Sequence, residues 1–236
     1  MRVPSRHREL FAGEKWQAAF GRKEAIEKIV SYVCSHWARL QKYPTGDIVF
    51  SQSEPKITKY FCQSLRAHAL SHGITGIFIP EHPVAKLDEL NKTLGNRGRT
   101  DITYFSDRQS PALEIVFEFK KLKLSSRGKI SRSQYCDAGM IRFVNGIYTP
   151  NDEIGFMVGL VENETDSASI SASLQRMLQH PDTRSLLRMV SDNKGKVVTS
   201  PALRFMRCHF ETHHARDHVE ECPDILLGHL ILSHGC

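Results

Sequence analysis

Apolar residues in the first third of the chain recur at three- and four-residue steps, the spacing that lines one face of an α-helix. Ile26, Val30 and Trp37 belong to the first such stretch, which a Tyr-Pro-Thr-Gly sequence ends. A Ser-Glu-Pro sequence opens the second stretch, with serine at the usual capping position and proline in the first turn. The pattern therefore predicts amphipathic helices over about 14–42 and 54–72.

Beyond the second helix the apolar positions alternate as in β-strands, with helical stretches between them. A polar turn separates two of the strands at 106–111. The predicted strands are 76–81, 100–105, 113–122, 155–161 and, near the end of the chain, about 202–210 and 225–232. The predicted helices are an insertion at 84–94, then 133–145, and 167–190 with a break near Pro181.

This order of elements predicts an α/β protein with a mixed central β-sheet flanked by helices. No internal repeat or long linker divides the sequence, so we expect one domain over residues 1–236. Its parts would be a core at about 50–162, an N-terminal helical segment at 13–43 and a C-terminal α/β extension at 163–236.

Composition narrows the class of protein. A hydrophobic fraction of 40% and a charged fraction of 25% are ordinary for a globular chain and exclude general disorder. The net charge of +6 favours a polyanionic partner such as nucleic acid. No apolar run is long enough to span a membrane, and the first residues lack the apolar segment of a secretory signal. Six scattered cysteines suggest reduced thiols, so we expect a cytoplasmic protein without membrane contact.

The strand at 113–122 carries charge where an apolar core is expected. Side chains alternate between the two faces of a strand, so Glu118 and Lys120 project from the same face. The opposite face is apolar throughout, with Leu113, Ile115, Phe117 and Phe119. A carboxylate and an ammonium on an otherwise apolar strand are costly to desolvate and therefore call for a chemical role.

Asp101 is expected to lie close to this pair. An antiparallel hairpin with its turn near residue 109 brings Asp101 opposite Phe117 or Glu118. Two carboxylates so close repel each other unless a cation lies between them. Oxygen ligands of this kind suit Mg²⁺ or Mn²⁺.

The order Asp101, hairpin, Glu118-Phe119-Lys120 resembles the D…(D/E)xK signature of the PD-(D/E)xK nuclease superfamily, which includes restriction, repair and phage-defence enzymes. The resemblance covers about residues 50–162 and implies a restriction-endonuclease-like core in the order αβββαβ. Glu54 is the best-placed match to a glutamate that many of these enzymes carry on the first core helix. The sequence departs from the family name at Thr100, where the name has proline.

The resemblance also implies roles for these residues. Glu54, Asp101 and Glu118, with the main-chain carbonyl of Phe119, would hold one or two Mg²⁺ or Mn²⁺ ions that stabilise charge on the scissile phosphate. Lys120 would orient the attacking water and offset negative charge in the transition state.

Each of these roles has a purely structural alternative. Glu118 and Lys120 could form a half-exposed ion pair on an edge strand, and Glu54 could serve only the first turn of its helix. Glu114 and Asp107 are the carboxylates that would replace a failed candidate.

A serine-rich basic segment leaves the same strand. Its positive side chains are candidates for contact with a phosphate backbone, and the alternative is a solvated surface loop. The candidates are Lys121, Lys123, Arg127, Lys129 and Arg132. Gln134 and Tyr135 follow, and the superfamily often adds polar residues to its site from the helix at this position.

Histidines and cysteines gather near the end of the chain, mainly at 208–222. They lack the close Cys-Cys spacing of a zinc knuckle, so we assign no metal site there.

Together these features predict a metal-dependent nuclease that hydrolyses phosphodiester bonds of DNA, acting in a phage-defence or restriction system. No reader domain is recognisable, which would leave control to a partner subunit or a second copy of the chain. The alternatives are an RNA-directed nuclease, and a nucleic-acid-binding or structural subunit that keeps the nuclease fold without catalysis.

Overall fold

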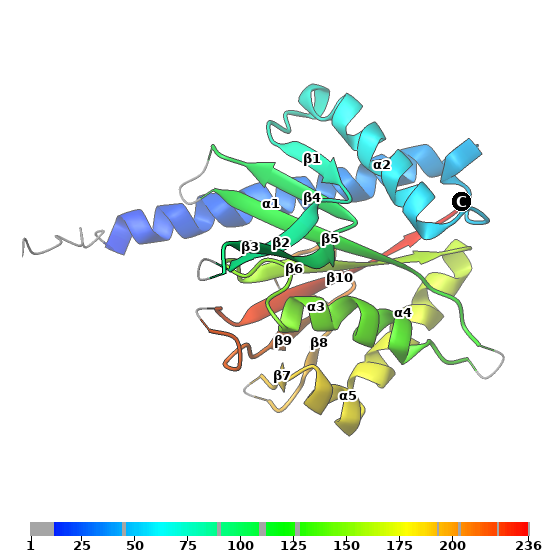
Figure 1. The fold of residues 1–236 in the computed structure, drawn as a ribbon. Coiled ribbons are helices and arrows are strands. Elements are labelled where there is room, and N and C mark those ends of the chain that lie inside the picture. The colour runs from blue at the N-terminus through cyan, green and yellow to red at the C-terminus, as the bar shows by residue number, and fades with distance from the viewer. Residues whose placement is uncertain are drawn as a thin grey trace, which may run out of the picture.

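The computed structural model shows a single large mixed sheet with helices on both faces (Figure 1). The structure describes residues 12–235 except 44–45, 89–90, 109–111, 126–127, 193, 203 and 221. Side chains are described from residue 21 onward, except at a few further positions near the tip of one hairpin. The α/β class and the mixed sheet flanked by helices are therefore confirmed.

The sheet has three parallel strands at its centre and antiparallel strands at both sides. Across the sheet its strands are β1 (Ile77–Pro80), β4 (Ile102–Ser106), β5 (Leu113–Lys121), β6 (Ile154–Val161), β10 (Ile225–Ser233), β9 (Phe210–His214) and β7 (Met189–Val190), with β8 (Val198–Thr199) paired to β9. Strands β5, β6 and β10 run parallel, so their carboxyl ends meet at one edge. Residues far apart in the sequence are thereby brought to that edge.

Two hydrophobic clusters, one on each face of the sheet, hold the helices against it. The N-terminal helices cover one face, where Phe117 and Phe119 of β5 are fully buried. Val116 of the same strand packs into the cluster on the opposite face, so the predicted alternation along β5 is confirmed. The first face carries α1 (Ala12–Gln41), η1 (Gly46–Ile48), α2 (Glu54–His68) and η2 (Leu70–His72). The second face carries η3 (Ser133–Met140), α3 (Ile141–Val144), α4 (Glu164–Leu178) and α5 (Pro181–Leu186).

The central elements occur along the chain in the order helix α2, strands β1, β4 and β5, helix η3 and strand β6, with residues 83–99 inserted between β1 and β4. This is the αβββαβ order that the sequence predicts, with the four strands adjacent in the sheet. The C-terminal part of the chain extends the same sheet, because β10 pairs with β6 and brings β9 beside it.

The prediction of a helix at 84–94 is wrong. This segment forms a hairpin of β2 (Pro83–Asp88) and β3 (Thr93–Arg99). The hairpin continues the β1–β4 ladder in the same register, through hydrogen bonds from Glu81 N–H to the Asp101 carbonyl and from Thr100 N–H to the His82 carbonyl. Local helix propensity therefore loses to a pairing that β1 and β4 already establish.

The strand expected at about 202–210 is also misplaced, because β9 begins only at Phe210. The main-chain N–H groups of Arg204 and Phe205 instead donate to Oε1 of Glu211, each at 2.9 Å. A carboxylate thus satisfies donors that a strand partner would otherwise take.

Among the described residues, no helix combines the length and hydropathy needed to cross a bilayer.

Candidate active site on strand β5

Glu118 and Lys120 form the centre of the candidate site. Both project from the face of β5 that helix η3 covers, and Lys120 Nζ donates a 2.7 Å hydrogen bond to Glu118 Oε1. Glu118 is only 1% exposed, so the pair is not the half-exposed edge pair of the structural alternative. Helix η3 approaches closely here, since a Cβ added at Gly139 would lie 3.5 Å from Cε of Lys120.

Asp101 lies at the bend where the β2–β3 hairpin leaves the sheet. Ile102 pairs with Phe117, so Asp101 stands level with Glu118, within the neighbourhood that the sequence predicts. Its Oδ2 accepts a 2.7 Å hydrogen bond from the main-chain N–H of Phe119. Burial and the nearby Glu118 carboxylate raise the pKa of Asp101 to about 7, against the opposing effect of Lys120.

Glu54 reaches the same strand from the first turn of α2. Its Oε2 accepts a 2.7 Å hydrogen bond from the main-chain N–H of Lys121, and its Oε1 lies 3.4 Å from Lys120 Nζ. Ser53 is the capping residue of α2 but makes no side-chain capping bond. The Glu54 carboxylate thus bonds across to β5, and three carboxylates far apart in the sequence meet around one lysine.

These charges shift one another's proton affinity. Burial alone would lower the pKa of Lys120, but Glu118, Glu54 and Asp101 outweigh it and hold that pKa above its ordinary value. Burial raises the pKa of Glu118, while Lys120 and Arg142 act against the rise. Lys120 is therefore protonated at neutral pH, whereas the carboxylates of Asp101 and Glu118 take up a proton more readily than ordinary carboxylates do.

One oxygen of Glu118 lacks a partner. Oε2 is buried and makes no hydrogen bond to any of the residues that the structure describes. A buried carboxylate oxygen without a donor or cation is costly, and native proteins rarely leave one so. This atom marks the position where an external ligand would be stabilised.

Arg142 supplies a second positive charge beside Glu118. Its Nη1 lies 3.9 Å from Glu118 Oε1 and donates to the hydroxyl of Tyr148. That hydroxyl in turn donates a 2.6 Å hydrogen bond to the carbonyl of Arg99, the last residue of β3. This link fixes the hairpin to the site. Arg142 lies on α3 and Tyr148 follows that helix, and no local sequence pattern signals their contact with Arg99, which is distant in sequence.

The oxygen atoms of the site suit a hard divalent cation. In the described part of the chain, however, no three His, Cys, Asp or Glu side chains are arranged to hold a metal ion. Lys120 Nζ instead binds Glu118 Oε1 and, at 2.8 Å, the carbonyl of Phe119. The Lys120 ammonium therefore binds two oxygens, Glu118 Oε1 and the Phe119 carbonyl, that belong to residues which the superfamily resemblance assigns to the metal. The other oxygen of this carboxylate, Glu118 Oε2, has no partner among the described residues and is of the type that a divalent metal ion binds.

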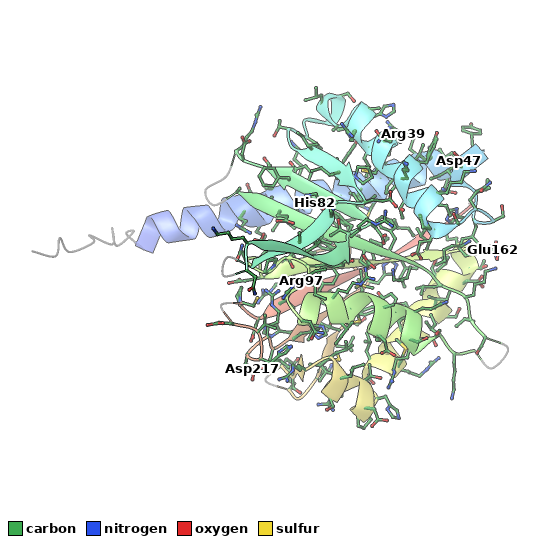
Figure 2. All side chains as sticks on the ribbon, viewed as in Figure 1. Arg39, Asp47, His82, Arg97, Glu162 and Asp217 are labelled. Carbon is green, nitrogen blue, oxygen red and sulfur yellow. The ribbon has the colours of Figure 1, made fainter. Side chains whose placement is uncertain are left out.

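The basic candidates differ in their surroundings. Lys121 points to the opposite face of β5, where its Nζ donates to the carbonyls of Phe50 and Gln52 and lies 4.3 Å from the centre of the Phe50 ring. Lys123 is exposed, with its Nζ 3.9 Å from Glu162 at the carboxyl end of β6 (Figure 2). Lys121 thus supports the segment leading to Glu54, while Lys123 faces solvent.

The remaining basic candidates follow along the segment that leaves β5. Lys129 is exposed, and Arg132 is exposed with its Nε 3.7 Å from Asp137. Arg127 lies outside the described residues.

The second-tier candidates do not join the cluster. Gln134 is exposed, and Tyr135 is fully buried with its hydroxyl 2.8 Å from Nδ1 of His229. Of the substitute carboxylates, Asp107 is exposed. Glu114 lies four residues before Glu118 on β5, about 13 Å away at the usual rise of a strand.

The histidines near the chain end form a buried hydrogen-bonded chain. Nδ1 of His214 must donate to the Leu187 carbonyl at 2.7 Å, which leaves its Nε2 to accept from the Thr212 hydroxyl. That hydroxyl then accepts from Nε2 of His229, whose Nδ1 accepts from Tyr135. Both imidazoles are neutral in this arrangement and serve the packing of β9 and β10 against η3.

Comparison with known proteins adds no assignment: no protein-family model, no curated protein and no solved structure matches this chain.

Proposed function

We propose that this protein is a metal-dependent nuclease of the PD-(D/E)xK superfamily that hydrolyses phosphodiester bonds of DNA. The observation that carries the proposal is the buried Glu118 carboxylate, whose Oε2 has no partner among the described residues although Lys120 and Asp101 lie beside it. Carboxylates gathered on a strand end, with a raised pKa and an unsatisfied oxygen, are typical of catalytic sites rather than of structural ion pairs.

Within this proposal the chain's own residues have distinct tasks. Glu54, Asp101, Glu118 and the carbonyl of Phe119 would hold Mg²⁺ or Mn²⁺, which when bound supplies positive charge against the developing charge of the phosphate. Lys120 would orient the attacking water and offset negative charge in the transition state. Hydrolysis adds the hydroxyl group of that water to phosphorus and leaves its other proton on the departing oxygen.

DNA as the substrate rests on the basic character of the chain and on the family resemblance. The net charge is +6, and exposed Lys123 and Lys129 lie on the segment leaving β5. A role in phage defence or restriction belongs to the same proposal and follows from the resemblance. The proposed cytoplasmic location rests on the scattered cysteines, and the proposed control by a partner subunit or second copy rests on the lack of a recognisable reader domain in the sequence.

The competing function is a nucleic-acid-binding subunit without catalysis. The 2.7 Å bond between Lys120 and Glu118 favours it, because an ammonium that neutralises the carboxylates can stabilise the fold without a metal. The two functions differ in what happens when a divalent cation is supplied.

The deciding experiment incubates the purified protein with plasmid DNA and with RNA, in Mg²⁺, in Mn²⁺ and in chelator. We expect DNA cleavage in both metals and none in chelator. Glu118→Gln is the matched inactive variant, because it removes the charge but keeps the shape. Cleavage of RNA alone would establish the RNA-directed alternative, and cleavage of neither substrate would overturn the nuclease proposal.

A further inference from the structure

A cavity of about 490 Å³ lies between the segment that leaves β5 and helices α4 and α5. This volume is within the range of sites that hold a small organic ligand and exceeds the need of a lone inorganic ion. It is separate from the carboxylates of the candidate active site but lies on the same face of the sheet. The lining residues relevant here are Lys129, Ile130, Arg132, Arg176, Met177 and His180.

One wall of this cavity is held in place by a helix. The buried hydroxyl of Ser173 on α4 donates a 3.1 Å hydrogen bond to the carbonyl of Gly128. Ile130 is 9% exposed and packs into the hydrophobic cluster beneath η3. Lys129 therefore projects from a short stretch that is anchored on both sides, and the cavity is formed without a ligand.

The rim of the cavity is positively charged. Lys129 and Arg176 are exposed and form no ion pair with any carboxylate that the structure describes. Asp182 is the acidic residue of the lining, and its Oδ2 lies 3.7 Å from Nδ1 of His180. Two unpaired cations thus outweigh one carboxylate that already has a neighbour, and the rim favours a phosphate group.

The floor of the cavity has a different character. Ile130 and Met177 contribute apolar surface, and both pack against the hydrophobic cluster of this face. A methionine thioether makes favourable contacts with aromatic rings. An apolar floor below a cationic rim matches a ligand that joins a planar ring to a phosphate.

We propose that this cavity binds one nucleotide of the substrate strand, with its base against Met177 and Ile130 and its phosphate at Lys129 and Arg176. The inference rests on the proposed nuclease function, and it adds the form of the substrate. A base can enter such a cavity only after it leaves the stack of a duplex. The protein therefore prefers single-stranded or unpaired DNA to an intact duplex.

The test measures binding in chelator, so that no strand is cut. The probes are a fluorescent single strand of about twelve nucleotides, an abasic strand of equal length and charge, and a duplex of the same sequence. Wild-type protein should bind the single strand more tightly than the abasic strand by about 5-fold, the low end of the range for a base stacked on an aromatic side chain, because Met177 and Ile130 offer apolar contact without an aromatic ring. It should bind the duplex less tightly than the single strand.

Two variants locate the effect. Met177→Ala should remove most of the preference for bases, and Arg176→Ala should weaken binding of both strands alike. Arg66→Ala removes the same charge from the exposed surface of α2, on the other face of the sheet, and should change neither affinity. Because Arg176 is exposed, its variant tests the cavity even if Met177→Ala destabilises the fold.

Equal binding of normal and abasic strands, or tighter binding of the duplex, would overturn the inference. So would Arg176→Ala binding as tightly as Arg66→Ala. These outcomes are separate from failure of the nuclease proposal, which would appear as absence of metal-dependent cleavage in wild-type protein while the binding preference persists.

Discussion

Nζ of Lys120 lies 2.7 Å from Oε1 of Glu118, two positions back on the same face of β5. The Lys120 side chain is 14% exposed and that of Glu118 is 2% exposed, so solvent screens the pair weakly. The same ammonium lies 3.4 Å from Oε1 of Glu54 on α2. Lys120 thus joins a strand and a helix through charge, and its replacement separates structural from catalytic roles.

Lys120→Ala should lower both stability and cleavage. Loss of the ammonium leaves the buried Glu118 carboxylate without its main counter-charge, a change that costs about 3–5 kcal/mol of unfolding free energy for buried pairs. Cleavage in saturating Mn²⁺ should fall by about 100-fold or more, with DNA affinity little changed. Denaturant unfolding and single-turnover kinetics measure the two effects.

Lys59→Ala is the matched control for Lys120, since Lys59 is exposed on α2. Lys121 is unsuitable as a control because its ammonium holds the carbonyls of Phe50 and Gln52 beside Glu54. Lys120→Arg should restore little cleavage, because a planar guanidinium cannot replace a compact ammonium. A Lys120→Ala variant that loses stability but cleaves at the wild-type rate would reduce the pair to a structural role.

Asp101→Asn should weaken metal binding and stabilise the metal-free protein at neutral pH. The pKa of Asp101 is raised to about 7 from 3.8, so its contribution to stability is full below pH 3.8 and is lost as pH rises towards 7. The neutral amide avoids this loss and can still accept from the Phe119 N–H. In chelator, the melting temperature of Asp101→Asn relative to that of wild type should therefore increase as the pH rises from about 4 to 8.

Asp107→Asn, at an exposed position, is the control, and its melting temperature should change with pH as that of wild type does. Undiminished Mn²⁺ binding by Asp101→Asn in a calorimetric titration would exclude Asp101 as a ligand.

The basic segment after β5 should contribute to DNA affinity through charge alone. Replacing Lys123, Lys129 and Arg132 by alanine should weaken binding of all sequences alike. The slope of log K against log salt should shrink by up to about 0.9 for each phosphate that the variant no longer neutralises. Alanine at Lys42, Lys59 and Arg66 removes equal charge from the α1–α2 side. Equal slopes for the two triple variants would mean that DNA binds elsewhere.

The buried histidine chain should make the protein sensitive to acid. Burial lowers the pKa of His214 to about 4, from 6.5. Since the unfolded state takes up the proton first, the stability that neutral His214 contributes is present above pH 6.5 and is lost as pH falls towards 4. His214→Gln should reduce the slope of unfolding free energy against pH by up to about 1.4 kcal/mol per unit. Parallel curves for wild type and His214→Gln would contradict the prediction.

The sequence alone determined the helices and strands in which apolar residues recur with a clear period over a short stretch of chain. The alternation of Leu113, Ile115, Phe117 and Phe119 specified strand β5 and put Glu118 and Lys120 on its other face, as the structure confirms. The position of the hairpin turn brought Asp101 level with Glu118 because antiparallel register follows from the turn. These features depend on residues within about twenty positions of one another, where chain geometry leaves few alternatives.

Only the tertiary structure decided the rest of the site. Glu54 bonds to β5 because α2 packs on Phe119, and Arg142 lies near Glu118 because α3 packs on the opposite face of the sheet. The Tyr135 hydroxyl bonds to His229 on β10, a strand formed near the end of the chain, and residues 83–99 form a hairpin because β1 and β4 already pair. Each outcome depends on contacts with residues that are distant in sequence. The packing and hydrogen bonds of these contacts outweigh the local propensity of a short segment, so the residue pattern within that segment does not reveal them.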